Sequence, residues 1–368
     1  FYYYNLLALI FILVFFYRLA EHGTDKSAQI LILLVTTEIF KIFISKKISD
    51  YEVSKISILF AITISLKAFY FLYGLILLPL LIFVAKEIGF NNLIKRVFFN
   101  RTFYFSLLLL TFVLITNILN TGCLIYPIIK SCFTNLDWSI QLKEIEFMKL
   151  HYEGWSKAGK TPNFVVNDIS NYVKDFNWVS NWINEYFFFK VSDFLLGLIV
   201  IIIIFFATFN SKKKIKKKFK KEIIYLYFTV IILLIEWFVN HPTLRYGGYS
   251  LVAISLFIPF SILLEKYKNQ TNLIKKKTLI IILIAITIFG LRNIDRIINE
   301  NKKYNYNVFL NPYYKVDETH FRIDKKINNL IKNYKDCLKD KIKCNVKDEF
   351  FIKTKMGKHI FIRKKDKF

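Results

Sequence analysis

The sequence predicts an all-α polytopic membrane protein with about nine transmembrane helices, an estimate that allows about 20 residues for each span. The first reason is composition: 55% of the 368 residues are hydrophobic, 18% are aromatic, and the mean hydropathy is +0.38. The second is that the apolar residues come in blocks about as long as a spanning helix. The third is that loops rich in lysine and arginine separate several of these blocks.

The predicted spans follow from these blocks in order. They lie near residues 2–18, 28–45, 56–86, 102–119, 191–209, 223–239, 250–264 and 278–294. The third block, of about 31 residues, is too long for one ordinary span, and Lys67 divides it. We therefore expect two short helices there, the second returning to the side from which the first began.

Four basic loops identify the cytoplasmic side. They are residues 46–55, 86–101, 212–221 and 265–277. All four lie on one side only if the block at 56–86 crosses an even number of times, so the positive-inside rule also favours two helices. An alternative makes 28–45 an interfacial helix, because Glu38 and Lys41 interrupt it, and makes 56–86 one long span. Loop 46–55 would then lie outside.

The formal net charge of +26 could suggest a nucleic-acid partner. The densest basic run, residues 212–221, lies between two apolar spans, whereas a nucleic-acid binder carries its basic residues on a soluble face. The run is typical of a cytoplasmic anchor. We therefore expect the lipid bilayer, and no nucleic acid, as a partner.

The charge rule divides the chain into four parts. Residues 1–119 and 191–294 are predicted to hold transmembrane helices, the first part with an outward acidic loop at 19–27. Residues 120–190 are predicted to form an outward loop domain, and residues 295–368 a small outward C-terminal domain. In a bacterium these outward parts would face the periplasm from the inner membrane.

All four cysteines fall in the outward parts. We expect Cys123 to pair with Cys132, and Cys337 with Cys344, because each pair is local and faces an oxidising compartment. Free thiols are the alternative. The spacings match no strong zinc pattern.

The acidic loop places Glu21, His22 and Asp25 at the mouth of two helices. Two carboxylates in one short loop can hold a divalent cation, or one can act as a base. The alternative is structural, because charged residues commonly end membrane helices and Thr24 or Asp25 could cap the helix that follows.

Lys67 lies between apolar runs, where an unpaired ammonium costs about 2.5 to 3.5 kcal/mol. It must therefore face protein, water or an anion. If the two helices form a hairpin, Lys67 sits at its outward turn and can reach the same pocket as Asp25. Snorkelling to the interface is the alternative.

A third polar element, residues 240–249, lies between two late spans and includes His241, Arg245 and Tyr246. Arg245 can bind a phosphate through two donors, and the glycines that follow would let the backbone approach a ligand closely. The alternative for Arg245 is an ordinary interface anchor.

Four tryptophans mark the predicted outward loop domain: Trp138, Trp155, Trp178 and Trp182. Such residues suit a cap that rests at the membrane interface. Stacking of a carbohydrate on one of these rings is the alternative.

The order of these elements resembles the GT-C superfamily of membrane glycosyltransferases, which take sugar from a polyprenyl phosphate carrier. In that family a Thr-Asp loop precedes a span, as Thr24 and Asp25 do here. A Thr-Lys or similar pair lies between two short helices, where this chain has Leu66 and Lys67. An Arg-Tyr pair enters a proline-containing helix, which matches residues 245–259. Residues 121–127 are also similar to a stretch found in bacterial polytopic membrane proteins of this general type.

The resemblance covers most of residues 15–265 and implies sugar transfer to an acceptor hydroxyl at the outer face of the inner membrane. The acceptor would be a glycan, a lipid or a protein. Lys67, His241, Arg245 and Tyr246 would bind the substrate. Glu21 and Asp25 would support catalysis, with a divalent cation near them as a possible cofactor.

One departure concerns the catalytic base. The principal carboxylate of the family lies in its first outward loop, whereas loop 19–27 matches a later one. We therefore expect the base to lie upstream of Phe1, in a longer parent chain. Two other functions remain open on the sequence: a transporter or flippase of a lipid-linked anion, and a non-enzymatic assembly subunit.

The topology is testable with reporter fusions. A tag at Lys216 should be cytoplasmic and a tag at Gly154 should be outside, because the lysine runs define the inward loops. Alkaline phosphatase and fluorescent-protein fusions at both positions would measure this. An outward Lys216 would contradict every orientation given above.

Overall fold

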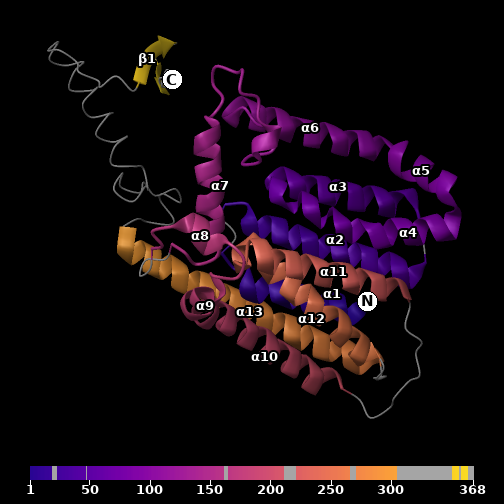
Figure 1. The fold of residues 1–368 in the computed structure, drawn as a ribbon. Coiled ribbons are helices and arrows are strands. Elements are labelled where there is room, and N and C mark those ends of the chain that lie inside the picture. Colours follow the sequence, from indigo (N-terminus) through magenta and orange to yellow (C-terminus); the bar gives the residue numbers. More distant parts are fainter. Residues whose placement is uncertain are drawn as a thin grey trace. The chain divides into compact units, whose positions relative to one another are not determined.

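The computed structural model describes residues 1–18, 23–46, 48–160, 165–210, 221–265, 271–304, 350–355 and 358–363. The chain divides into two compact units, Phe1–Ile294 and Asp295–Phe368. Long helices dominate the first unit (Figure 1).

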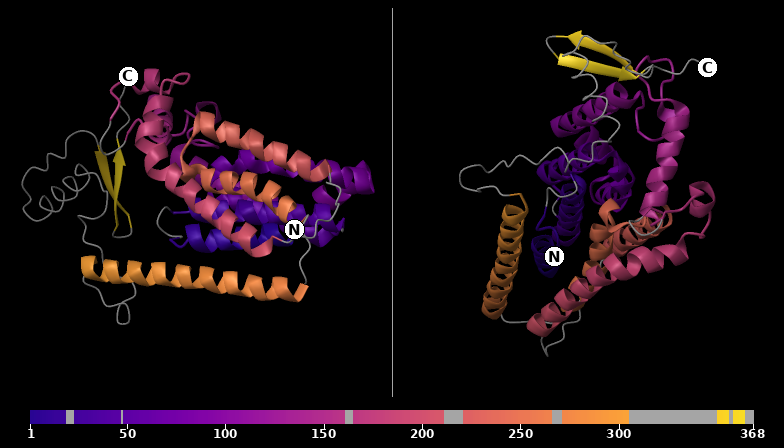
Figure 2. Two further views of the ribbon diagram at one scale, coloured as in Figure 1. Left: turned by 90° about the horizontal axis from the view of Figure 1, so that it is seen from below. Right: turned by 90° about the vertical axis from the view of Figure 1, so that its left-hand side faces the viewer.

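Seven helices in the described residues are long and apolar enough to cross a membrane. They are α2 (Asp25–Ser45), the stretch Ala68–Ile88 formed by η2 (Ala68–Ile76) and α4 (Leu77–Ile88), α6 (Arg101–Thr121), the stretch Val179–Phe209 ending in α10 (Ser192–Phe209), α11 (Lys221–Asn240), α12 (Gly248–Glu265) and the stretch Leu273–Lys302 of α13 (Thr271–Tyr304). Figure 2 shows α13 as one long helix in both views.

Two further helices lie at the positions of predicted spans but are shorter. They are α1 (Tyr2–Phe15), with 14 residues, and α3 (Asp50–Leu66), with 17. The first turn of α3 is acidic, and Ser49 caps it by accepting a hydrogen bond from the Glu52 amide. The later turns of α3 are mostly apolar, and the helix is one residue shorter than the shortest of the seven.

The chain breaks at Lys67, as its position between two apolar runs predicts. Lys67 has an extended backbone between the end of α3 and the start of η2. The start of α3 lies near the segment that follows α4, because Arg96 donates to the Ile48 carbonyl (2.6 Å) and Asn100 to the Ser54 hydroxyl (2.7 Å). The two helices therefore run up and back, as expected.

Helix α2 lies among other helices and contacts α1, α3, α4, α11 and α12. Its residues Ile32 and Leu33 are fully buried, and Tyr4 of α1 stacks on Phe40 with ring centroids 5.1 Å apart. This packing disfavours the alternative in which 28–45 is a helix on the membrane surface, because such a helix buries only one face.

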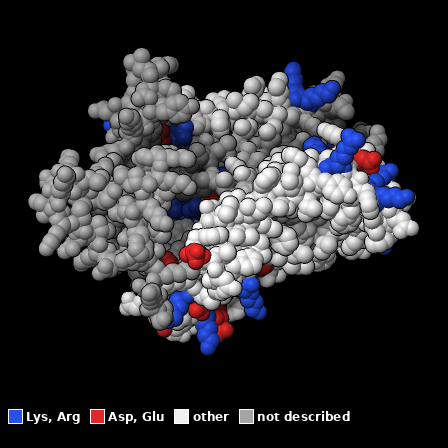
Figure 3. Space-filling model, turned by 90° about the horizontal axis from the view of Figure 1, so that it is seen from above, with Lys and Arg blue, Asp and Glu red and all other residues white. Residues whose placement is uncertain are grey.

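Basic residues gather at one end of the helices. The short helix α5 (Phe90–Phe98) carries Lys95 and Arg96 in its last turn, and Lys46 pairs with Glu87 at 3.4 Å. Figure 3 shows blue side chains at the right-hand end, where α4 and α5 lie in Figure 1, beside a wide uncharged surface. Helix α6 contributes exposed apolar side chains such as Phe105 and Phe112, which suit contact with lipid.

Residues 120–190 form short helices that connect α6 to α10. They are η3 (Ile129–Ser131), α7 (Leu142–Ser156), α8 (Ile169–Val173), α9 (Val179–Trp182) and the π-helix η4 (Ile183–Val191). Cys123 and Cys132 form a disulfide in this segment, in agreement with the pairing expected from their spacing. Cys337 and Cys344 lie outside the described residues, so their pairing stays a prediction.

The second unit contains the described strands, β1 (Phe350–Lys355) and β2 (Lys358–Arg363). They pair antiparallel, with Ile352 opposite Phe361. An all-α prediction therefore misses this hairpin, whose aromatic and β-branched residues favour strands.

Two ion pairs join α2 to α3. Lys55 lies 2.5 Å from Glu38, and Lys41 lies 2.9 Å from Glu52. The two glutamate side chains are only 13% and 16% exposed, so each depends on its lysine for compensation of its charge. The residues that interrupt the apolar pattern of the span at 28–45 thus face α3.

We expect Glu38→Gln to lower the free energy of unfolding by about 1 to 2 kcal/mol. Breaking a buried pair costs about 3 to 5 kcal/mol, and the partial exposure of Lys55 reduces this value. Thermal unfolding in detergent would measure the change. Glu87→Gln is the matched control, because the Lys46–Glu87 pair is longer and more exposed and should matter little. Equal effects of the two variants would contradict the prediction.

Candidate functional site

The site begins where α2 begins. Asp25 is the first residue of this helix, and its side chain is 2% exposed. The Thr24 hydroxyl before it donates to the carbonyl of Leu66 (2.9 Å), which is the last residue of α3. This bond ties the start of α2 to the break at Lys67. Glu21 and His22 lie outside the described residues.

The break brings Lys67 to Asp25. Its ammonium forms an ion pair with Oδ1 of Asp25, while the Lys67 side chain stays 30% exposed. The ammonium also lies 4.9 Å from the ring centre of Tyr246. The sequence-based expectation that Lys67 can reach Asp25 agrees with this geometry.

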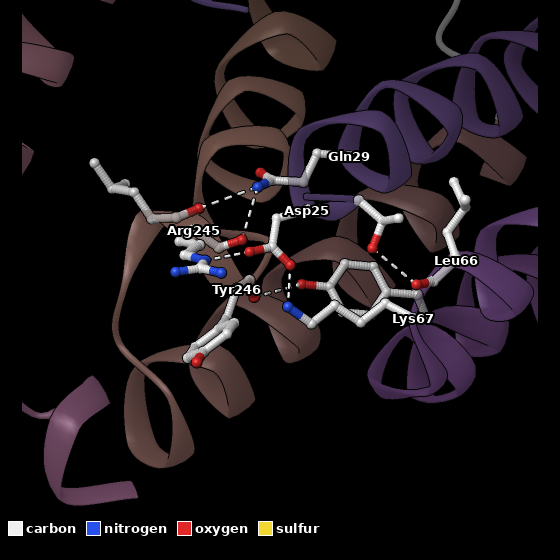
Figure 4. Close-up of polar contacts among 9 residues, drawn as sticks. Asp25, Gln29, Leu66, Lys67, Arg245 and Tyr246 are labelled. Carbon is white, nitrogen blue, oxygen red and sulfur yellow. Dashed lines mark hydrogen bonds and ion pairs between the residues drawn. The ribbon is translucent and has the colours of Figure 1, made fainter. Parts of the chain in front are cut away.

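Arg245 approaches the same carboxylate from the loop between α11 and α12. Its Nε pairs with Oδ2 of Asp25, although the two residues are 220 positions apart. Both carboxylate oxygens of Asp25 therefore face a cation (Figure 4). The three side chains together carry a net charge of +1, which favours an anion nearby.

Gln29, one turn after Asp25, fixes the loop that carries Arg245. Its amide nitrogen donates to the carbonyls of Arg245 (2.9 Å) and Leu244 (3.3 Å), and its oxygen accepts from the Ser250 amide (3.0 Å). Gln29 is fully buried, so these bonds satisfy an amide that would be costly to leave unpaired.

Aromatic side chains hold the rest of this loop. The indole of Trp182 donates to the Pro242 carbonyl (2.8 Å), and that of Trp237 donates to the Thr243 carbonyl (2.8 Å). The Leu244 amide donates to the Tyr186 hydroxyl (3.0 Å). The loop is thus held by side chains from several elements before any ligand arrives.

The two glycines after Tyr246 serve packing. Gly247 has φ +100°, and a Cβ there would overlap the Tyr73 hydroxyl. A Cβ on Gly248 would overlap the ring of Trp237. Tyr73 and Trp237 therefore explain why both positions need glycine, and the expectation that these glycines let the backbone approach a ligand closely stays a prediction.

The cations keep free donors despite their bonds to Asp25. Within the described residues Arg245 bonds through Nε, and its two terminal nitrogens point away from the carboxylate in Figure 4. Its side chain is 37% exposed. Two parallel N–H donors of a guanidinium match two oxygens of a phosphate or carboxylate. The site is therefore suited to bind an anion from its exposed side.

Tyr246 and His241 lie beside Lys67 and Arg245 and do not bond to the Asp25 carboxylate in the described structure. Their rings are 6.0 Å apart, and the Phe69 ring lies 5.5 Å from His241. Nδ1 of His241 lies 3.4 Å from the Ser156 hydroxyl of α7. Burial lowers the pKa of His241 below its usual value and raises the pKa of Tyr246, so both side chains favour the neutral form.

Three residues near the site were missed by the sequence reasoning: Gln29, Tyr70 and Glu236. Gln29 could have been found, because it lies four positions after Asp25 and so on the same helix face. Glu236 is an isolated acid inside an apolar span, which is itself a signal. The buried Tyr70 hydroxyl has no hydrogen-bond partner in the described part of the chain, and only the fold reveals this.

A metal site at Glu21 and Asp25 stays a prediction. The described residues contain no group of three or more His, Cys, Asp or Glu side chains that could hold an ion, and Glu21 is outside them. Asp25 already pairs through both oxygens with cations, so a metal ion would compete with Lys67 and Arg245 for it.

The fold defines the class: the chain is a multi-pass helical membrane protein. Residues 2–252 match a family model described as a domain of unknown function (DUF8201), and the chain belongs to this family. The matched range includes Asp25, Lys67, Trp155 and Arg245. Comparison with curated proteins and with solved structures finds no match.

We expect Gly247→Ala to destabilise the site by about 2 kcal/mol or more, because it adds both a strained positive φ and an overlap with Tyr73. The melting temperature in detergent would measure this. Gly290→Ala is the control: its Cβ enters open space, and alanine favours helix α13. Adding Tyr73→Phe to Gly247→Ala should restore part of the loss. An unchanged melting temperature for Gly247→Ala would contradict this account of the loop.

Proposed function

We propose that this protein is a glycosyltransferase that moves a sugar from a polyprenyl phosphate carrier to an acceptor hydroxyl. The observation that carries the proposal is the pair of cations at Asp25. Lys67 and Arg245 come from separate parts of the chain, share one buried carboxylate and keep exposed donors. The order of these elements along the chain also resembles the GT-C superfamily.

Transfer of a sugar from a phosphate carrier needs a pair of cations such as Lys67 and Arg245. The bond between the anomeric carbon and the phosphate oxygen breaks, and a bond from that carbon to the acceptor oxygen forms. The acceptor proton passes to a base, and the carrier leaves as polyprenyl phosphate with one more negative charge. Lys67 and Arg245 stabilise this charge as it develops, which is the main electrostatic task in such a transfer.

Asp25 acts in this proposal as a positioning residue. Both of its oxygens pair with cations, Oδ1 with Lys67 and Oδ2 with Arg245, so neither is left to face the acceptor hydroxyl. Its task is to hold Lys67 and Arg245 close together despite their mutual repulsion. The base that takes the acceptor proton is then another carboxylate, and Glu21 is a supporting residue.

The location of the site supports activity at the outer face of a bacterial inner membrane. Asp25, Lys67 and Arg245 lie at the ends of helices whose opposite ends adjoin the basic segments 46–55, 86–101 and 265–277. Basic loops are typical of the cytoplasmic side. The proposed site then faces the periplasm, at a depth where a lipid carrier can present its phosphate.

The proposal can be tested with the protein at its native length in nanodiscs. Binding of undecaprenyl phosphate should weaken about 10-fold or more in Arg245→Lys, because lysine cannot reproduce two parallel donors. Sugar release from undecaprenyl phosphate monosaccharides, with envelope extract as acceptor, should fall in the same variant. Arg96→Lys is the matched control, since Arg96 has a similar exposure (35%) at the basic end.

Each outcome has a clear meaning. Binding without sugar release by the wild-type protein would favour a transporter or flippase of a lipid-linked anion. If the wild-type protein did not bind undecaprenyl phosphate, the anion site would be contradicted. A non-enzymatic assembly subunit would then be the remaining function. If Arg245→Lys and Arg96→Lys changed binding and sugar release equally, Arg245 would be an ordinary interface anchor.

A further inference from the structure

Trp155 differs from the other tryptophans of residues 120–190. Trp178 is fully buried and Trp182 is 4% exposed, and their indole N–H groups donate to the carbonyls of Asp175 and Pro242. Trp138 is exposed, but its N–H donates to the Ile118 carbonyl at the end of α6. Trp155 is 38% exposed, and its N–H makes no hydrogen bond within the described residues.

The Trp155 ring lies against the cationic site. Its centre is 5.9 Å from the guanidinium carbon of Arg245 and 6.1 Å from the centre of the Tyr246 ring. Lys67 in turn lies 4.9 Å from the Tyr246 ring. An aromatic surface formed by Trp155 and Tyr246 therefore adjoins the two donors proposed to bind phosphate.

The backbone that carries Trp155 is firmly held. Its neighbour Ser156 is fully buried and donates to the Glu153 carbonyl (2.7 Å). Lys157 is also buried, pairs with Glu153 at 2.7 Å and donates to the Val173 carbonyl. The last turn of α7 is thus anchored on its buried side while the Trp155 ring remains partly open.

We propose that Trp155, with Tyr246 beside it, is the surface on which the sugar ring of the lipid-linked donor stacks. One face of a pyranose carries C–H groups, which pack on an aromatic face, and its hydroxyls can use the free indole N–H. The sugar is joined directly to the phosphate, so it must lie next to the donors of Lys67 and Arg245. This inference rests on the proposed function and adds the residue that distinguishes a glycosylated carrier from a bare one.

The test compares two ligands. The native-length protein in nanodiscs is titrated with undecaprenyl phosphate and with undecaprenyl phosphate carrying glucose, mannose, galactose or N-acetylglucosamine. Trp155→Ala should weaken binding of the best glycosylated ligand about 3- to 10-fold and leave the bare phosphate unchanged. Trp155→Phe should restore most of the affinity. Trp138→Ala is the matched control, and melting temperatures report on folding.

The outcomes separate this inference from the proposed function. If Trp155→Ala lost the same affinity for both ligands, the stacking inference would be overturned, and Trp155 would instead support Arg245. Unchanged binding of both ligands in that variant, or a wild-type protein that binds no glycosylated ligand better than the bare one, would also overturn it. In these cases the anion site stands. A wild-type protein that binds neither ligand would refute the proposed function itself.

Discussion

Asp25 joins three parts of the chain through one buried carboxylate: the start of α2, the break after α3 and the loop before α12. Lys67 and Arg245 repel each other, and the carboxylate between them compensates half of their combined charge. Because Asp25 is buried and both cations are partly exposed, the carboxylate is held inside and the remaining donors face outward. The arrangement leaves one net positive charge to attract an anion.

The loop that carries Arg245 is organised before a ligand binds. Its carbonyls accept hydrogen bonds from Gln29, Trp182 and Trp237, and its glycines allow it to lie against Tyr73 and Trp237. A rigid site loses little entropy when it binds and needs little reorganisation when charge develops. The structure therefore places the partly exposed donors of Arg245 on a loop that several buried side chains hold.

The sequence predicted most of the fold because its signals are local. Apolar blocks of a given length predict spans, and a lysine within an overlong block predicts a break, so α2 to α4 and α6 lie close to their expected positions. The short C-terminal strands were missed because a few alternating residues give a weak pattern. The first turns of α3 are charged, and Glu52 and Lys55 there pair with Lys41 and Glu38 of α2.

By itself the sequence determined that this is a helical membrane protein with an aspartate, a lysine and an arginine near span ends. The predicted hairpin already allowed Lys67 to reach Asp25, and only the tertiary structure decided that Arg245 pairs with the same carboxylate. It also decided that Gly247 and Gly248 make room for aromatic rings, and that Trp155 lies against Arg245. The physical reason is that periodicity reports which residues share a face of one helix. Contacts between residues 220 positions apart depend on how all the helices pack.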